Sequence, residues 1–245
     1  MSDLVLDRTY RKGDQGGQVG LIQEWLCLHN FGVVIDGDFG PATDYAVRQF
    51  QGQSGLPVDG VVAPMTFAAL IQPMTAALGA ILGGRTLGPM IVAYAQQHLA
   101  QHPCEVGGQN CGPWVRLYMK GQQGADDPWC AGFACFIMEQ AAQTLGVTPP
   151  IPSSFSCSAL AGSAKQAGLF LDGDNPADRV KLGPGCLFLE RGGATGWQHT
   201  GITVQPMPDS YQTIEGNTND NGSADGYEVC ARTRNYTGKD FVLIS

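Results

Sequence analysis

The chain has 245 residues, of which 43% are hydrophobic and 34 are glycine, a composition typical of a loop-rich globular protein with one large or two smaller domains. Its formal net charge is -8 at pH 7. Because the sequence offers no basic stripe to phosphates, we expect no nucleic acid partner. The negative charge equally disfavours docking on an anionic membrane.

The N-terminal residues, MSDLVLDRTYRKGDQ, lack the charged-then-apolar layout of a signal peptide. The most apolar stretch, MTAALGAILGGRTLGPMIVAYA, is interrupted by Gly83, Gly84, Arg85 and Pro89. It therefore leaves about half of the roughly 20 residues that span a bilayer. We expect a protein that is made in the cytoplasm without a signal peptide. If it acts outside the cell, another route must take it there.

Residues 11–71 contain an internal half-repeat with an offset of 23 positions, first as VIDGDFGPATDYAVRQF and then as PVDGVVAPMTFAAL. In each copy an Asp-Gly pair predicts a turn, and a proline follows where a first helical residue is expected. An earlier helix carries Val19, Ile22, Trp25 and Leu26 at helical spacing. The pattern predicts three short helices without an acid pair, nucleophile or metal cluster. By itself it fits equally well a bundle that only spaces another domain.

This segment, GQVGLIQEWLCLHNFGVVIDGDFGPATDYAVRQFQGQSGLPVDGVVAPMTFAAL, resembles the three-helix type of peptidoglycan-binding domain across nearly its full length. The leucine-glutamine step of that family is here Ile22-Gln23. Its DGxFGxxT motif spans 36–43, and its FQxxxGLxxDG motif spans 50–60. Ala63 departs from the pattern, because the second turn usually has glycine there. The resemblance implies a cell-wall ligand.

The region 73–88 is rich in glycine and proline and is typical of a linker with at most one short apolar turn. A second domain follows from about Pro89. We therefore expect a peptidoglycan-binding domain at 1–72, a linker at 73–88 and a larger domain at 89–245.

The stretch GADDPWCAGFACFIMEQ contains Cys130 and Cys135. Asp126 or Asp127 can cap a helix whose first residue is Pro128. Cys130 then lies in the first turn, where free backbone N–H groups and the helix dipole stabilise a thiolate. Cys135 lies over a turn deeper among aromatic residues, where burial raises the pKa of a thiol. Cys130 is thus the candidate nucleophile; the simpler interpretation is that both cysteines are core residues.

The chain has eight cysteines, an awkward number for a protein without a signal peptide, because a disulfide framework needs an oxidising compartment. Five of them lie mostly in apolar runs, and we interpret these as small buried hydrophobic residues: Cys27, Cys135, Cys157, Cys186 and Cys230.

A cysteine nucleophile needs a base, and the base needs an orienting group. His199 lies on a predicted strand in GWQHTGITVQ, which a turn joins to a second predicted strand, YQTIEGNTND. If Val204 pairs with Tyr211, then Glu215 and Asn217 flank His199 from the neighbouring strand, to within one residue of register. A carboxylate or amide there would fix the tautomer of the imidazole. A surface histidine at a polar strand end is the simpler alternative.

These segments together resemble the CHAP family of cysteine, histidine-dependent amidohydrolases and peptidases, from AQQHLAQHPCEVGGQNCGPWVRLY to the C-terminus. The PWCAxF motif lies at 128–133, the HxGI motif at 199–202 and the third motif at 215–217. Two positions depart from the family pattern. Cys186 replaces the acid of a Pro-Gly-Asp turn, and Thr200 stands where valine is commoner.

The CHAP resemblance implies a papain-like fold, with helices packed on an antiparallel sheet, and so an α+β class for the chain. It implies that Cys130 is the nucleophile, His199 the general base and Glu215 the orienting residue, with Asn217 as a fourth member. The backbone N–H of Cys130 would help to form the oxyanion hole. The resemblance requires no cofactor and no metal.

A rival constellation occurs in HLAQHPCEVGGQNC, which brings together His98, His102, Cys104 and Cys111. Histidines at i and i+4 followed by two thiols can bind zinc, although the C-x6-C spacing is wider than in common zinc motifs. Alternatively, the two cysteines could close a glycine-rich loop by a disulfide. We interpret Glu105 in the same segment as structural.

Together the two resemblances predict a bacteriolytic peptidoglycan hydrolase. One domain holds peptidoglycan, and the other cleaves an amide in the stem peptide or at its link to the sugar. Attack by Cys130 gives a thioester acyl-enzyme, which water activated by His199 hydrolyses. Both endopeptidase and N-acetylmuramoyl-L-alanine amidase activities fit this chemistry.

Two settings explain a wall enzyme without a signal peptide. A phage endolysin waits in the cytoplasm until a holin opens the membrane. An antibacterial toxin delivered to the periplasm by a secretion machine needs an immunity protein in its producer, and the acidic charge favours this setting weakly. The alternatives from other classes are a non-catalytic wall-binding protein and an amidohydrolase for a small thiol-linked or polyamine amide.

Overall fold

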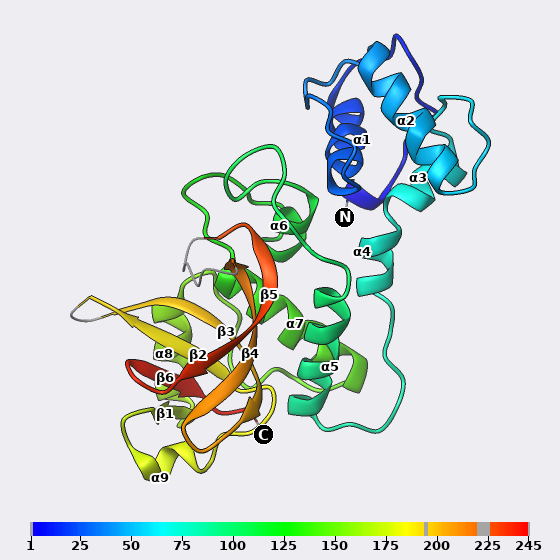
Figure 1. Cartoon of the computed structure of the whole chain (residues 1–245). Helices are drawn as coiled ribbons and strands as arrows, with labels where there is room; N and C mark the ends of the chain where they lie inside the picture. Colours follow the sequence, from blue (N-terminus) through cyan, green and yellow to red (C-terminus); the bar gives the residue numbers. More distant parts are fainter. Residues whose placement is uncertain (1, 194–195, 220–225, 245) are drawn as a thin grey trace.

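The computed structural model describes residues 2–193, 196–219 and 226–244 (Figure 1). Its N-terminal domain is a bundle of short helices. Their bounds are η1 (Ser2–Leu4), α1 (Gly17–Leu28), α2 (Pro41–Gln53) and α3 (Pro64–Leu70). Pro41 and Pro64 are the first residues of their helices, as predicted. The predicted apolar face of α1 is fully buried through Val19, Ile22 and Trp25.

Two buried glutamines, Gln23 and Gln51, hold the two predicted Asp-Gly turns in the same way. Each amide nitrogen donates to the aspartate of its turn at 2.8 Å, to a backbone carbonyl and to a threonine hydroxyl. Each amide oxygen accepts the two backbone N–H groups of the turn, 36–37 for Gln23 and 59–60 for Gln51. The half-repeat seen in the sequence is thus a repeated hydrogen-bond network that builds the domain.

The predicted linker is partly helical. Helix α4 (Gln72–Ala77) fills its first part, and Met74 and Ala77 are buried. Gln97 of helix α5 (Leu87–Leu99) donates to the carbonyls of Ala77 and Gly79 at 3.0 and 2.8 Å. An ordered helix therefore packs on the second domain where one short apolar turn was expected. The domain boundaries themselves stay a prediction.

The second domain combines helices with one six-stranded sheet, in the order β1-β6-β2-β3-β4-β5, in which every strand pair is antiparallel. The remaining helices are α6 (Pro113–Tyr118), α7 (Cys130–Leu145), α8 (Cys157–Gln166) and α9 (Pro176–Arg179). The strands are β1 (Phe170–Asp172), β2 (Leu187–Gly192), β3 (Gly196–Pro206), β4 (Ser210–Thr218), β5 (Glu228–Asn235) and β6 (Lys239–Val242). The α+β class is confirmed.

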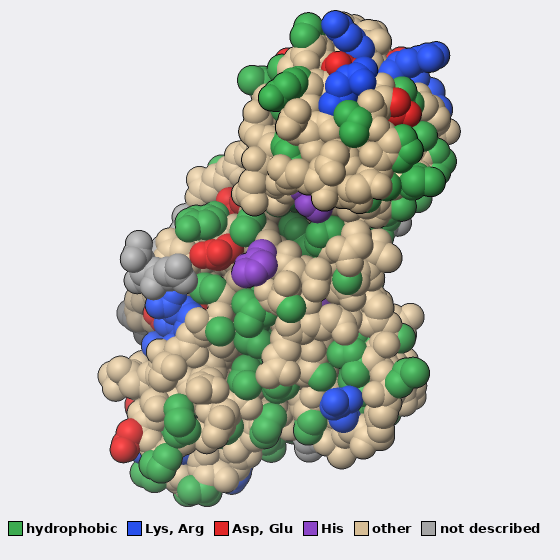
Figure 2. Space-filling model, turned by 45° about the vertical axis from the view of Figure 1, so that its right-hand side comes forward, with side chains coloured by type: hydrophobic (Ala, Val, Ile, Leu, Met, Phe, Trp, Pro, Cys, Tyr) green, Lys and Arg blue, Asp and Glu red, His purple; other side chains and the backbone are tan. Residues whose placement is uncertain are grey.

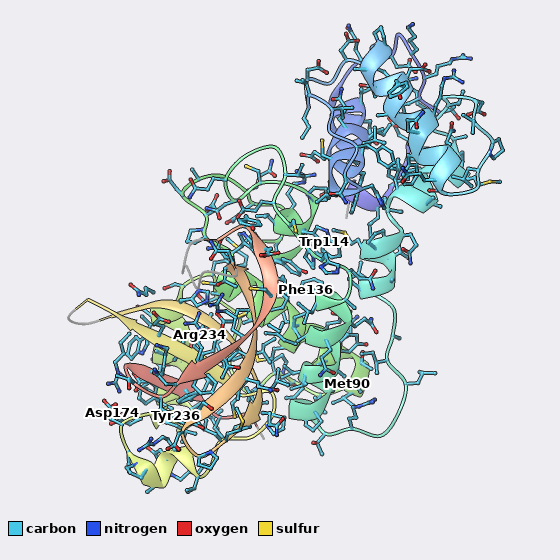
Figure 3. All side chains as sticks on the ribbon, viewed as in Figure 1. Met90, Trp114, Phe136, Asp174, Arg234 and Tyr236 are labelled. Carbon is cyan, nitrogen blue, oxygen red and sulfur yellow. The ribbon has the colours of Figure 1, made fainter. Side chains whose placement is uncertain are left out.

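The two faces of the sheet bury different side chains, because successive residues of a strand point in opposite directions. One face joins the main core, with α5, α7 and α8 packed against it (Figure 1). Met90 of α5, Trp114 of α6 and Phe136 of α7 lie on this helical side of the domain (Figure 3). The other face carries a smaller hydrophobic cluster of one leucine and four aromatic residues: Leu171, Phe188, Tyr211, Tyr236 and Phe241.

Helix α7 begins two residues later than predicted. Its first residue is Cys130, and Trp129 takes the N-cap position. Pro128 lies before the helix, because the preceding residues form a turn closed by the N–H of Asp127 on the carbonyl of Gly124 at 2.9 Å. The helix ends at Leu145, and Gly146, which follows it, is left-handed.

The hairpin register differs from the predicted one. Ile202 pairs with Ile214, an irregularity follows between Thr203 and Gln205, and Pro206 pairs with Tyr211. The prediction that Val204 pairs with Tyr211 is therefore wrong by two residues, of which the bulge after Thr203 accounts for one. On the His199 side of the bulge, the register set by Ile202 and Ile214 differs from the predicted one by one residue, which is the tolerance that the prediction gave for His199.

The two domains meet at Arg116 of α6. Its guanidinium donates to Asp3 at 2.7 Å, to both carboxylate oxygens of Glu24 at 2.6 and 3.1 Å, and to Gln123 at 2.8 Å. These charged side chains are only 13–18% exposed, so water screens the pairs incompletely. The contact ties α1 to the loop region that precedes α7.

Figure 2 shows lysine and arginine side chains gathered at the end of the N-terminal domain that points away from the sheet. The basic residues of that domain are Arg8, Arg11, Lys12 and Arg48. Among the residues that the structure describes, no helix is both long and apolar enough to cross a membrane.

Candidate active site

The thiol of Cys130 lies at the first residue of α7 and is 3% exposed. The pKa of Cys130 is lowered well below its ordinary value of 9.0. The largest cause is a hydrogen bond with Cys157, followed by interactions with His199 and with the backbone N–H of Thr200; burial opposes them. The site therefore favours a thiolate at Cys130.

His199 of β3 is fully buried beside Glu215 of β4, with Nε2 2.9 Å from the carboxylate. Burial alone lowers the pKa of His199, but Cys130 and Glu215 together raise it to about 9. Its other ring nitrogen, Nδ1, is buried and has no hydrogen-bond partner among the described residues. Hydrogen bonds of catalytic groups commonly form fully only when substrate binds.

Glu215 is held ionised by its partners. Burial raises its pKa, but hydrogen bonds from Arg234 and His199 lower it to about 2. Arg234 of β5 forms a bidentate contact with both carboxylate oxygens of Glu215, at 2.6 and 2.5 Å. The hydroxyl of Thr213 also donates to this carboxylate, at 2.5 Å. The fixed carboxylate can orient His199 and stabilise its positive charge.

Glycines at two positions allow the strands to close on this site. A side chain at Gly216 would meet Trp129 and Phe133 of the α7 region at 2.7 Å. A side chain at Gly201 would meet the Cγ atom of Glu215 at 2.7 Å. The first glycine lets the nucleophile helix approach β4, and the second leaves room for the orienting carboxylate.

Asn217, predicted as a fourth member, is fully buried but does not bond to His199. Its backbone is left-handed, with φ 54°. Neither its Oδ1 nor its Nδ2 atom has a hydrogen-bond partner within the described residues. The structure therefore brings Cys130, His199 and Glu215 together in one chain of contacts and leaves Asn217 outside it.

Glu105 supports the residue that precedes the nucleophile. One carboxylate oxygen accepts the indole N–H of Trp129 at 2.8 Å, and the other accepts the backbone N–H of Asn110 at 2.8 Å. Tyr118 stacks on Trp129 with ring centroids 5.6 Å apart. These contacts agree with the structural role predicted for Glu105.

The rival histidine and cysteine set is not assembled into one site. His98 is buried, with Nδ1 2.9 Å from the hydroxyl of Tyr118 and Nε2 3.0 Å from the side-chain oxygen of Gln140. Burial lowers the pKa of His98 to about 4. All eight cysteines are free thiols, including Cys104 and Cys111. Among the described residues, no group of three His, Cys, Asp or Glu side chains is placed to hold a metal ion.

Two neighbours of the site, Arg234 and Cys157, were missed from the sequence. Arg234 lies on a strand with alternating basic residues, CARTRN, which indicates a charged face. That pattern could have suggested a cation for the buried carboxylate. Cys157 was interpreted as a small core residue, and no local pattern connects it to Cys130, which lies 27 positions earlier.

Comparison with known proteins identifies the N-terminal domain. Residues 15–70 match the family described as "Putative peptidoglycan binding domain". A zinc D-Ala-D-Ala carboxypeptidase of Streptomyces albus G is 50% identical over 40 residues, which are 16% of this chain and 16% of that protein. An uncharacterized protein of Kitasatospora aureofaciens is 44% identical over 59 residues, 23% of this chain and 50% of that protein. The matches thus span half or less of these relatives.

Solved structures give similar results. The N-terminal domain of SleB is 34% identical and covers 27% of this chain and 93% of its own, with a TM-score of 0.27. A fused Zn-dependent amidase/peptidase/peptidoglycan-binding protein from Clostridium acetobutylicum is 38% identical over 26% of this chain and 28% of its own, with a TM-score of 0.24. A Burkholderia AP3 phage endolysin is 20% identical over 66% of this chain and 62% of its own, with a TM-score of 0.26. Scores of this size define no shared overall fold, and the role of the second domain must come from its own geometry.

Proposed function

We propose that the protein is a cysteine-dependent peptidoglycan hydrolase that cleaves an amide bond of the stem peptide. One observation carries the proposal: the buried imidazole of His199 interacts with the thiol of Cys130 and is hydrogen-bonded through Nε2 to an ionised Glu215. A nucleophile, a base and an orienting carboxylate in this order are the parts that acyl transfer requires.

In the proposed mechanism each residue has one step. The thiolate of Cys130 attacks the amide carbonyl carbon, and the imidazolium of His199 gives its proton to the departing amine. A thioester then links the acyl group to Cys130. His199, now neutral, takes a proton from water, which attacks the thioester and releases the acid. Glu215 stays ionised throughout, because Arg234 neutralises its charge in the buried site.

The substrate class follows from the N-terminal domain. A domain of the peptidoglycan-binding family would hold the enzyme on the wall and raise the local concentration of bonds that it can cut. A relative in sequence is named as a zinc D-Ala-D-Ala carboxypeptidase, which is consistent with a wall substrate. That name specifies zinc, whereas the geometry of this chain supports a thiol as the attacking group.

The test is digestion of purified peptidoglycan by wild type, Cys130→Ala and Cys186→Ala. Cys186 is a matched control, because it is a fully buried free thiol of the same domain. We expect wild type and Cys186→Ala to release fragments and Cys130→Ala to lose at least about 10³-fold in rate.

Mass spectrometry of the fragments then names the bond. Free lactyl groups indicate an amidase, and new amino termini within stems indicate an endopeptidase. If wild type and Cys130→Ala release fragments at the same rate, the thiol mechanism is wrong. If neither releases any fragment and both sediment with the wall, the protein is a wall-binding protein without hydrolytic activity.

A further inference from the structure

The thiol of Cys157 faces the proposed nucleophile. The sulfur atoms of Cys130 and Cys157 are 3.8 Å apart, close to van der Waals contact. Cys157 is the first residue of α8, as Cys130 is the first residue of α7, so the two thiols meet between two helix starts. Cys157 is 7% exposed and Cys130 is 3% exposed. Each thiol therefore contacts the other, and neither is an isolated cysteine of the hydrophobic core.

The two thiols differ in protonation. The hydrogen bond between them lowers the pKa of Cys130 and raises the pKa of Cys157 well above its ordinary value. A thiolate therefore lies against a protonated thiol. The thiolate is the form that reacts with peroxides, and a second thiol in contact can resolve the oxidised product before it oxidises further.

We propose that Cys130 and Cys157 form a reversible disulfide when the protein meets a hydroperoxide, and that this cross-link switches the site off. The Cys130 thiolate attacks the peroxide, the O–O bond breaks, and Cys130 becomes a sulfenic acid while hydroxide or alkoxide leaves. The sulfur of Cys157 then attacks the sulfenic sulfur, the S–O bond breaks, and water leaves with the proton of Cys157. Two thiols and one hydrogen peroxide thus give one disulfide and two waters.

The local structure permits the required movement. An S–S bond is about 2.05 Å long, so the sulfur atoms must approach by roughly 1.8 Å. Cys157 follows a connection, 147–156, that contains no helix or strand. Ser154 of this connection accepts a hydrogen bond from the thiol of Cys135 at 3.4 Å, and Ser156 caps α8. The approach therefore requires a small shift of the first turn of α8 toward α7, and the preceding connection has no helix or strand that would have to unfold.

The consequence for hydrolysis rests on the proposed function, because only a free Cys130 can attack the amide. In the disulfide its sulfur is bonded to Cys157, and a dithiol reductant would restore both thiols. Formation of the cross-link itself is a separate matter, which a mass measurement tests without any substrate.

The experiment uses the full-length protein, reduced and freed of reductant, and then treated with hydrogen peroxide. For wild type we expect a loss of about 2 Da, a peptide that joins Cys130 to Cys157, and a fall of at least about tenfold in wall hydrolysis that dithiothreitol reverses. Cys186→Ala is the matched control, because Cys186 is a buried free thiol of the same domain that lies outside α7, α8 and the connection between them. We expect it to behave as wild type.

Cys157→Ser and Cys157→Ala remove the resolving thiol. In Cys157→Ser, whose hydroxyl can keep the hydrogen bond to Cys130, we expect Cys130 to gain about 32 Da as a sulfinic acid, with activity that dithiothreitol does not restore. Cys157→Ala also removes the hydrogen bond that most lowers the pKa of Cys130, so we expect the same product to form more slowly. The inference is overturned if wild type also accumulates sulfinic acid at Cys130, or if the cross-link joins a different pair. If the disulfide forms but reduced wild type cuts no wall, the cross-link stands and the proposed function fails. If reduced wild type cuts the wall but forms no disulfide, only the cross-link fails.

Discussion

The two domains treat buried polar groups differently. In the N-terminal domain, Gln23 and Gln51 use every polar atom of their amides in hydrogen bonds to the two Asp-Gly turns. In the sheet domain, His199 Nδ1 and both amide atoms of Asn217 are buried without a partner among the described residues. Of the seven such atoms, only that of Gln18 lies in the N-terminal domain.

This difference separates groups that build the fold from groups that await a ligand. A buried polar atom without a partner costs about 1–3 kcal/mol, so a fold retains it only where something compensates. The glutamines stabilise turns and need no substrate. The Nδ1 atom of His199 instead belongs to a ring whose pKa is raised by Cys130 and Glu215, which fits a site that completes its contacts in the reaction.

The largest expected effect comes from Glu215→Gln. The amide cannot supply the charge that holds His199 as imidazolium, and Arg234 would lose its buried carboxylate. We expect kcat/KM for wall hydrolysis to fall by about 10³–10⁴-fold, and the free energy of unfolding to fall by about 3–5 kcal/mol. Steady-state kinetics and chemical denaturation measure the two effects.

Glu190→Gln is the matched control for that experiment. Glu190 also accepts a hydrogen bond from Arg234, at 3.0 Å. It pairs with His199 through the strand backbone, and its carboxylate contacts Gln198 and Lys239. We expect its kcat/KM to stay within about threefold of wild type. An equal loss of activity in both variants would show that Glu215 acts only through the general stability of the sheet.

The next largest effect tests whether wall binding by the N-terminal domain can be lost while hydrolysis is kept. In Gln51→Ala the backbone N–H groups of Asp59 and Gly60 lose their acceptor. We expect the N-terminal domain to lose about 1–3 kcal/mol of stability. Binding to sedimented peptidoglycan should weaken while hydrolysis of a soluble stem-peptide fragment is kept. Gln53→Ala, at an exposed position of the same helix, should change neither. Loss of activity on the soluble fragment would contradict this separation.

The pH dependence tests the charge state of the site. Hydrolysis needs the thiolate of Cys130, whose pKa is lowered, and the imidazolium of His199, whose pKa is about 9. We expect kcat/KM to rise as pH passes the pKa of Cys130 and to fall about tenfold per unit above pH 9. Cys130→Ser should lower the pKa of His199, because the thiolate is the largest of the influences that raise it. If the pKa of His199 measured by NMR is unchanged in that variant, Cys130 and His199 do not form an interacting pair.

The free energy of unfolding should also depend on pH through His199 and Glu215, and the two residues should act in opposite directions. The contribution of His199 is fully present below its ordinary pKa of 6.5 and is lost as pH rises through about 9. The contribution of Glu215 is present above its ordinary pKa of 4.5 and is lost as pH falls through about 2. Thermal unfolding from pH 2 to 10 should therefore show a plateau between these two declines. A continuous rise up to pH 10 would contradict the raised pKa of His199.

The features that depend on local sequence preferences could be predicted from the sequence, whereas those that depend on long-range packing could not. The Asp-Gly turns and the helix starts at Pro41 and Pro64 follow from backbone preferences of single residues, and the structure has them. Strand alternation predicted that Glu215 lies beside His199, and the structure has this contact although the register is shifted. The glutamate side chain is long enough to reach the imidazole from either register. Cys157 could not be found in this way, since its position depends on how α8 packs against α7.

The smallest expected effect lies at the contact between the two domains. Arg116→Ala removes the guanidinium that joins Asp3 and Glu24 to α6, and partly buried pairs of this kind contribute about 1 kcal/mol. We expect a larger radius of gyration in small-angle scattering and about a two- to threefold lower rate on intact wall, because the domains no longer hold one orientation. Arg48→Ala, whose pair with Asp44 lies within one helix, should leave both unchanged. If Arg116→Ala keeps the radius of gyration but loses activity on soluble fragments, its role is to support the loop before α7, and the two domains are not coupled through this contact.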